Sequence, residues 1–375
     1  MKIVHLGIRH SGWRGGVQTY IRELYTRTRN RGHSVGVYFV PKKGVCVESA
    51  PGIYSVDVPF SNDFVRLRLQ NIYSNVLGAI SDADLIHYHH YGPAFYSFIQ
   101  ALANKPTVYT FHGSAAVACD HSVKKHFIEW IEKRALRSCD RIVVVTKGLA
   151  RLLDSYDISH TFIPHGADPQ HGPISDQDIY ERFGLRKGEY LLHVGRLLPA
   201  KGAAVLIQAF RKLKNASKPL VICGDSDNLA YIEQLRSLAY DSQGTVRLLG
   251  NVEDDLLHAL YSNAYLFVSP LQIKGFPLAV VEAMSHGRCV VMSDAYETEE
   301  PHHAYGIRTA PGNVADLKKV LEELLVDEQK VAHWGAKAKA YVAKAHNWEK
   351  VVREYEDIYA QLTQHHRVKD CRKHT

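Results

Sequence analysis

Short apolar runs of strand length alternate with amphipathic segments along most of the chain. In the first part of the sequence, such runs stand at residues 2–8, 35–40, 85–88, 107–111 and 142–145. Apolar positions at helical spacing separate most of these runs. Continuous apolar strands that alternate with helices are typical of a parallel sheet covered on both faces. The first part of the chain therefore predicts an α/β domain.

The same pattern starts again after a polar stretch at residues 166–188 that contains prolines and glycines. Strand-length runs return at residues 190–194, 220–223, 246–249, 266–268 and 289–292. We therefore expect an α/β protein with two Rossmann-like, doubly wound domains. The first would span residues 1–168 and the second residues 169–345.

The end of the chain, residues 346–375, has a different pattern. Residues 346–359 are strongly amphipathic at helical spacing, and residues 367–373 are rich in basic side chains. We expect a long helix here, followed by a basic tail that frays.

Composition narrows the class of protein. The chain has 375 residues, 46% hydrophobic and 23% charged, which is ordinary for a globular protein and excludes a disordered, collagen-like or small disulfide-stapled chain. No apolar window approaches the roughly 18–20 residues that a membrane span needs. The six cysteines lie far apart without a CxxC pair, which argues against a zinc knuckle or a disulfide framework. We therefore expect a protein of the reducing cytoplasm.

Charge is distributed unevenly along the chain. The net charge is +7, and residues 1–150 hold 19 Lys and Arg against 10 Asp and Glu, a local excess of +9. A basic surface attracts phosphates, acidic polymers or an anionic membrane, and the cationic, aromatic-bearing segment at residues 123–137 could lie on such a membrane. The alternative is a solvated face without a partner, with Phe127 and Ile131 packed on the sheet.

The first loop of each predicted domain carries candidate chemistry. Gly15 and Gly16 precede the first helix, where backbone amides and the helix N-terminus favour an anion. The spacing is not the GxGxxG of a nicotinamide enzyme, and a Gly-Gly pair before a helix is often only a turn. In the second domain, Arg196 follows a strand and Lys201 precedes the next helix. Two cations beside a helix N-terminus predict a diphosphate site, and the alternative is a pair of solvated side chains.

A glycine loop at residue 275 then leads into a helix that carries Glu282. A carboxylate at this place can accept hydrogen bonds from ribose hydroxyls, although a helical glutamate is more often solvated.

The order and spacing of these motifs resemble the retaining nucleotide-sugar glycosyltransferases of family 4, the glycosyl transferases group 1. Their GT-B fold has two Rossmann-like domains facing across a cleft. The motifs that carry the resemblance are residues 15–16, 107–112, 142–147, 163–168, 193–202, 223–225, 249–252 and 275–287. They cover nearly the whole chain, and the final helix resembles the family segment that crosses back to the first domain.

The resemblance assigns roles to individual residues. It implies that Arg196 and Lys201 bind the donor diphosphate in place of a metal, so that no metal or other cofactor is needed. His112 would lie near the donor sugar, and Lys274 occupies a position of the catalytic set. The implied donor-binding residues are Gly15, Gly16, Gly195, Gly224, Asn251, Val252, Gly275, Phe276, Pro277, Leu278 and Glu282. Among these, Asn251 and Val252 would lie against the nucleobase.

Three positions depart from the family pattern. Lys274 stands eight residues before Glu282, where the family usually has a glutamate that contacts the donor sugar. It indicates an acidic donor, a lysine turned to solvent or paired with a phosphate or Glu282, or lost activity. The other two departures are His165 in place of asparagine and Gly113 in place of an acidic residue.

Other patterns are weaker. Three Asp-x-Asp triplets, which begin at Asp82, Asp176 and Asp225, could each hold a metal, but three occurrences in one chain make the pattern unspecific. His87, His89 and His90 cluster in a strand, and with 22 histidines in the chain we expect core or cleft histidines there rather than metal ligands. No nucleic-acid-binding module is found.

The expected function is retaining transfer of a hexosyl unit from a nucleoside diphosphate sugar to a saccharide or lipid-linked glycan of a cell-envelope polysaccharide. The enzyme would be cytoplasmic, with peripheral contact to an anionic membrane. Two alternatives stay open: a nucleotide-sugar 2-epimerase or hydrolase on the same fold, and a catalytically silent nucleotide-sugar-binding subunit.

Overall fold

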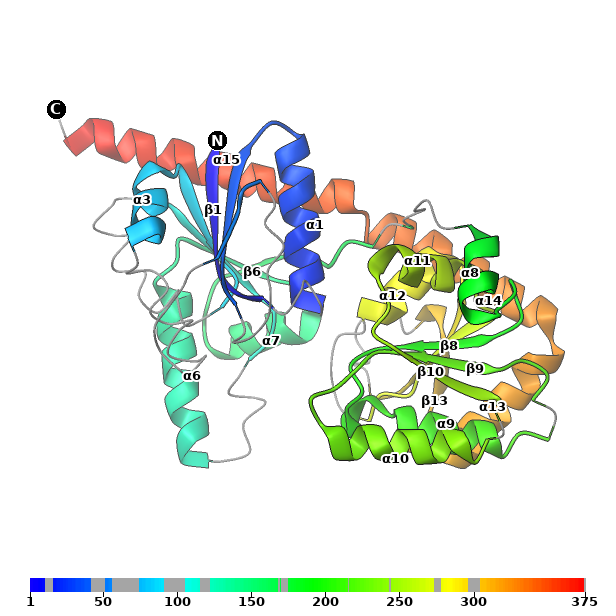
Figure 1. Cartoon of the computed structure of the whole chain (residues 1–375). Coiled ribbons are helices and arrows are strands. Elements are labelled where there is room, and N and C mark those ends of the chain that lie inside the picture. Colours follow the sequence, from blue (N-terminus) through cyan, green and yellow to red (C-terminus); the bar gives the residue numbers. More distant parts are fainter. Residues whose placement is uncertain are drawn as a thin grey trace. The chain divides into compact units, whose positions relative to one another are not determined.

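The computed structural model describes residues 1–10, 16–41, 51–55, 74–90, 105–114, 122–167, 169, 175–214, 216–242, 244–272, 278–295 and 304–373. The chain divides into two compact units (Figure 1). Unit 1 comprises Met1–His165 together with Glu349–Thr375, and unit 2 comprises Gly166–Trp348. Unit 1 is therefore built from both ends of the chain.

Unit 1 contains a parallel sheet with the strand order β3-β2-β1-β4-β5-β6-β7. The strands are β1 (Lys2–His10), β2 (Ser34–Pro41), β3 (Ile53–Ser55), β4 (Leu85–Tyr88), β5 (Thr107–Phe111), β6 (Arg141–Val144) and β7 (Thr161–Phe162). The strand order reverses between β1 and β4, and ligands of doubly wound folds bind outside the carboxyl ends of the strands at such a switch point.

The helices described in unit 1 are α1 (Gly16–Asn30), α3 (Ser74–Asp82), α6 (Ser122–Arg137), α7 (Lys147–Ser155) and α15 (Trp348–Lys373). Helix α1 begins at the glycine loop and buries Tyr20, Ile21 and Leu24. Their spacing places them on one face of the helix, and this face packs on the sheet.

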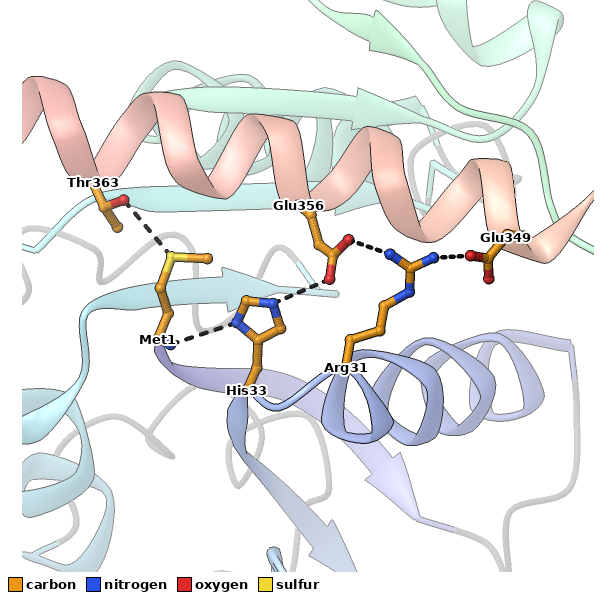
Figure 2. A network of polar contacts seen from close by, with 6 residues as sticks. All are labelled: Met1, Arg31, His33, Glu349, Glu356 and Thr363. Atoms are coloured by element: carbon orange, nitrogen blue, oxygen red, sulfur yellow. Dashed lines mark hydrogen bonds and ion pairs between the residues drawn. The ribbon is translucent and has the colours of Figure 1, made fainter.

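Helix α15 is attached to unit 1 by a row of polar contacts (Figure 2). Arg31 forms ion pairs with Glu356, at 2.8 Å, and with Glu349. The His33 Nε2 atom lies 3.1 Å from a carboxylate oxygen of Glu356, and Thr363 donates to the Met1 sulfur. The end of the chain is thus tied to the first strand and the first helix.

Unit 2 contains a second parallel sheet, with the order β10-β9-β8-β11-β12-β13. Its elements are α8 (Asp176–Phe183), β8 (Leu191–Val194), η2 (Pro199–Lys201), α9 (Ala203–Arg211), β9 (Leu220–Cys223), α10 (Leu229–Tyr240), β10 (Val246–Gly250), α11 (Asp254–Asn263), β11 (Leu266–Ser269), α12 (Leu278–Ser285), β12 (Cys289–Ser293), β13 (Ile307–Thr309), α13 (Val314–Val326) and α14 (Glu328–Ala345). Consecutive strand residues enter opposite cores: Leu191 packs with α9, α10 and α13, whereas Leu192 packs with α8, α11, α12 and α14. Helices therefore cover both faces (Figure 1).

These two sheets confirm the predicted α/β class with two Rossmann-like domains. The strands β3, β7 and β13 were not predicted, because two or three residues carry too little periodicity. The expected fraying of residues 367–373 is wrong, since α15 continues to Lys373. No helix in the described part of the chain is long and apolar enough to span a membrane.

Two helical glycines should respond oppositely to substitution. A Cβ at Gly335 of α14 would lie 2.3 Å from the carbonyl oxygen of Gly287, whereas a Cβ at Gly78 of α3 would meet no atom within 4 Å. We expect Gly335→Ala to lower the free energy of unfolding by ~1–3 kcal/mol, because backbone atoms cannot make room. Gly78→Ala, the matched control, should raise it by ~0.5–1 kcal/mol. Denaturant titration measures both, and an unchanged Gly335→Ala midpoint would contradict the packing described.

Candidate functional site

Three loops of unit 2 interlock at the carboxyl ends of β8, β9 and β10. Gly224 has a φ of +137°, and a Cβ there would lie 1.9 Å from the carbonyl oxygen of Gly195. The amide of Gly224 donates to the Gly250 carbonyl at 2.7 Å, and the amide of Leu197 donates to the Asp225 carbonyl at 3.0 Å. Only glycine at 224 permits this approach. The structure therefore brings the predicted Gly195 and Gly224 together.

A fourth loop, which follows β11, holds the segment that carries Lys201. Gly202 has a φ of +80°, and a Cβ there would lie 2.0 Å from the carbonyl oxygen of Pro270. The backbone of η2 therefore packs closely on the loop after β11. Since β8 and β11 flank the switch point of this sheet, Lys201 is anchored where ligands of such folds bind.

Arg196 and Lys201 form a pair of cations without a counter-charge. Arg196 is exposed and Lys201 is half-buried, and neither has an ion-pair partner among the described residues. The pKa of Lys201 is lowered, first by burial and second by the positive charge of Arg196. A bound anion would reverse the second effect. Five guanidinium donors and an ammonium group beside it suit the oxygens of a diphosphate.

His193, in β8, is a site residue that the motif reading missed. Its Nδ1 lies 2.8 Å from the carbonyl oxygen of Val268, which can only accept, so Nδ1 carries the hydrogen. Its Nε2 is buried without a hydrogen-bond partner in the described structure. The pKa of His193 is lowered to about 4, mainly by burial and also by the charge of Lys201, while the hydrogen bond to the Val268 carbonyl acts to raise it. The sequence feature that could have identified His193 is its polar side chain within an otherwise apolar strand, two positions before Gly195.

Glu282 lies on α12, which begins at Leu278. The hydroxyl of Tyr261, a buried residue of α11, donates to the Glu282 Oε2 atom at 2.9 Å. The pKa of Tyr261 is raised well above its usual value, mainly by burial and then by the Glu282 charge. Tyr261 therefore stays protonated and holds the carboxylate in place. No sequence pattern indicated this contact, because strand β11 lies between Tyr261 and Glu282 in the chain.

The loop after β10 is linked to the loop after β9. Asn251 Nδ2 donates to the Asp225 Oδ2 atom at 3.1 Å, and Val252 packs on the core.

The other two Asp-x-Asp triplets also make structural hydrogen bonds. Asp84 accepts from the Lys2 amide at 2.8 Å, and Asp178 forms a capping box with Ser175 at the start of α8.

In unit 1, His112 follows β5 at the carboxyl edge of the sheet. Its Nε2 lies 3.1 Å from the Nδ1 of His89, and burial lowers the pKa of His112 to about 3. The ring of Tyr20 packs edge-on against it, with 5.1 Å between centroids. Gly16 is the exposed first residue of α1. The expectation of core histidines is met by His87 and His89, which are 0% and 5% exposed.

Five predicted site residues lie outside the described residues. They are Gly15, Lys274, Gly275, Phe276 and Pro277.

Two of the apolar side chains of helix α6 are buried and two are exposed. Ile128 and Ile131 are buried, whereas Phe127 and Trp130 are 57% and 56% exposed. The two exposed rings stack on each other with 6.2 Å between centroids. The packing alternative therefore holds for Ile131 and fails for Phe127.

Comparison with known proteins identifies relatives of both units. Residues 14–171 match the family model for Glycosyltransferase Family 4, and residues 176–341 match that for Glycosyl transferases group 1. The phosphatidyl-myo-inositol mannosyltransferase of Mycolicibacterium smegmatis is 27% identical over 361 residues, covering 92% of this chain and 90% of the relative.

Solved structures share the fold over nearly the full length. Sucrose-phosphate synthase from Thermosynechococcus elongatus superposes with a TM-score of 0.79 at 19% identity, covering 96% of this chain and 98% of that one. HepE of Anabaena, in complex with UDP-glucose, superposes with a TM-score of 0.76 at 19% identity, covering 96% and 100%.

Four histidines with lowered pKa values should make unit 1 sensitive to acid. Burial lowers the pKa of His5 and His112 to about 3, and that of His87 and His89 well below the ordinary value. Below pH ~6.5 the unfolded chain binds protons that the folded chain does not. The free energy of unfolding should therefore have its full value above pH ~6.5. It should decrease as the pH is lowered towards ~3, by up to ~1.4 kcal/mol per pH unit for each histidine.

Denaturant unfolding across this range measures the slope. His112→Gln should reduce it by about one histidine's share. Equal stability at neutral pH and about pH 5 would contradict the prediction.

Proposed function

Since this chain belongs to the GT-B glycosyltransferases of family 4, we propose that it moves a hexosyl unit, with retention, from a nucleoside diphosphate sugar to a saccharide or lipid-linked glycan. The reaction would serve cell-envelope polysaccharide synthesis at the cytoplasmic face of a membrane. The observation that carries the proposal is the pair of cations Arg196 and Lys201 at the switch point of unit 2, which form no ion pair with any residue of the described ranges.

In this proposal, Arg196 and Lys201 stabilise the diphosphate as the bond between sugar and phosphate breaks. Negative charge develops on the leaving group, and preorganised donors aimed at it lower the barrier without reorganising. The dianion would also relieve the repulsion that lowers the pKa of Lys201. Positive side chains would thus supply what a metal supplies in other enzymes, and we propose that no metal is required.

The remaining donor contacts follow from the loops. We assign the ribose hydroxyls to Glu282, held by Tyr261, and the nucleobase to Asn251 and Val252. The lone pair on His193 Nε2 can accept a hydrogen bond from Lys201 or from the donor. We assign the sugar to His112.

The names of two relatives support the choice of substrates. One relative is a phosphatidyl-myo-inositol mannosyltransferase, which favours a hexosyl donor and a lipid-bearing acceptor. Another is an O-antigen chain mannosyltransferase of Escherichia coli, 24% identical over 302 residues, which favours an envelope polymer.

Substitution of either cation should lower turnover. We expect Arg196→Ala and Lys201→Ala each to reduce kcat by about 10²–10³-fold, as for the loss of one charge-stabilising donor. Arg236→Ala is the matched control, because this exposed cation of α10 pairs only with Glu233 within the described contacts. Wild-type rates in either site variant would overturn the assignment.

The assay is nucleotide release from a panel of nucleotide sugars, including a uronic acid donor because of Lys274, with and without acceptor. Release that depends on acceptor supports transfer. Release without acceptor indicates a hydrolase, an altered sugar without release indicates an epimerase, and nucleotide binding without turnover indicates a silent subunit. A chelator should leave turnover unchanged, and a strict requirement for Mg²⁺ or Mn²⁺ would contradict the metal-independent mechanism.

We also propose that α6 rests on an anionic membrane through Phe127 and Trp130. Their rings are exposed and adjacent, and Lys125 and Arg134 are exposed on the same helix. Aromatic rings beside basic side chains suit the headgroup region of an anionic leaflet.

Removal of both rings should weaken this contact. Phe127→Ser with Trp130→Ser should reduce binding to phosphatidylglycerol vesicles by ~10-fold or more, because each ring would lose apolar burial. Tyr240→Ser, which removes an 87% exposed ring of α10, should bind as the wild type does. Vesicle co-sedimentation measures both, and unchanged binding of the double variant would refute the proposed surface.

A further inference from the structure

The turn that carries Lys201 is bound to the loop after β11 by Gln272. The amide of Gln272 donates to the Ala200 carbonyl at 2.9 Å, and its side-chain Nε2 donates to the Pro199 carbonyl at 3.0 Å. Both acceptors belong to η2. We call residues 198–202, which contain η2, the Lys201 turn. Gln272 therefore holds two successive carbonyl groups of this turn from a loop that is 73 residues away from Pro199 in the sequence.

The Lys201 turn depends on contacts from outside because it is short. Its own bonds run from the Lys201 amide to the Leu198 carbonyl, at 2.8 Å, and from the Gly202 amide to the Pro199 carbonyl, at 3.0 Å. A 3₁₀ turn of three residues has poorer hydrogen-bond geometry than an α-helix. The Pro199 carbonyl therefore accepts from Gly202 inside the turn and from Gln272 outside it.

The backbone that carries Lys201 is held on both sides. Before the turn, the amide of Leu197 donates to the Asp225 carbonyl at 3.0 Å. After it, Gly202 packs against the Pro270 carbonyl, two residues before Gln272. The loops after β9 and β11 thus fix this backbone, and the side chain of Lys201 is what remains free to adjust.

The chemistry of a glutamine suits this contact. A side-chain amide can donate to a carbonyl oxygen, whereas a carboxylate can only accept. Glutamate at position 272 would also bring a negative charge to the turn that carries Lys201. The side chain of Gln272 is exposed, so its volume is not needed to fill the core. Its length and its donor group are what the contact uses.

We propose that Gln272 is a positioning residue of the diphosphate site, which holds the Lys201 turn so that the Lys201 ammonium group meets a diphosphate in a preset place. A group fixed before the ligand arrives does not have to be ordered on binding. The identity of the ligand rests on the proposed function, whereas the held turn rests on contacts within unit 2 alone.

Hydrogen exchange of the ligand-free protein tests whether Gln272 holds the turn. We expect the amides of Lys201 and Gly202 to exchange about tenfold faster in Gln272→Met, which keeps the length of the side chain and removes its donor. The amide of Gly224, which donates to the Gly250 carbonyl in a neighbouring loop, should exchange at the wild-type rate. Unchanged exchange at Lys201 and Gly202 would overturn the inference, whatever the activity.

Nucleotide affinities test the consequence for the ligand. UDP, GDP and ADP are each compared with the matching monophosphate by calorimetry, and the ratio of the two Kd values measures selectivity for the diphosphate. We expect Gln272→Met to reduce this selectivity about tenfold, the effect of one lost hydrogen bond, and Gln272→Glu to reduce it further through its negative charge. Gln234→Met, at an exposed glutamine of α10, is the matched control and should keep the wild-type selectivity.

A merely structural role would give a different result. General loosening of unit 2 would weaken the binding of diphosphate and monophosphate alike and leave their ratio unchanged. Wild-type selectivity in Gln272→Met and Gln272→Glu would therefore overturn the positioning role.

The two experiments also separate this inference from the proposed function. If the wild-type protein binds none of the nucleotides, the proposed function fails, and the exchange rates still decide whether Gln272 holds the turn. If the wild-type protein selects diphosphates but Gln272→Met leaves the exchange rates unchanged, the proposed function stands and the positioning role is refuted.

Discussion

Every strand pairing described in the two sheets is parallel, and this constraint determines where the chemistry can lie. A parallel sheet is covered on both faces, so its strands must be apolar and the polar side chains are displaced to the loops. Because all strands point the same way, those loops gather at one edge. In unit 2, the loop glycines at 202 and 224 then allow backbone to contact backbone, which places Arg196 and Lys201 on a rigid base.

Unit 1 departs from this rule inside its sheet. His5, His87 and Thr110 are polar strand residues with 0% exposure. Buried polar groups are tolerated when they are hydrogen-bonded. Here His87 and Thr110 bond to each other and to Tyr359 and Tyr355 of α15, and His5 bonds to His89. Helix α15 therefore supplies hydrogen-bond partners for polar residues that are buried in the sheet of unit 1. The ion pairs of Arg31 hold the same helix from the outside (Figure 2).

The candidate site of unit 2 differs from the histidine cluster of unit 1 in that its side chains are charged. The histidines of unit 1 are kept neutral by burial, whereas Arg196 and Lys201 of unit 2 have no ion-pair partner among the residues that the structure describes. Two adjacent cations destabilise the free protein slightly, and an anionic ligand removes that penalty.

The sequence by itself determined the alternation of strands and helices, the two Rossmann-like domains, the loop that carries Arg196 and Lys201, and the helix that carries Glu282. These features are local, since they depend on periodicity and on residues a few positions apart. Tertiary structure alone decided that Tyr261 bonds to Glu282, that Ile128 rather than Phe127 faces the sheet, and that α15 continues to Lys373. It also decided the hydrogen bond between His5 and His89, because these residues are 84 positions apart and meet only through the register of β1 with β4. Contacts of that kind are fixed by strand order, which no local pattern encodes.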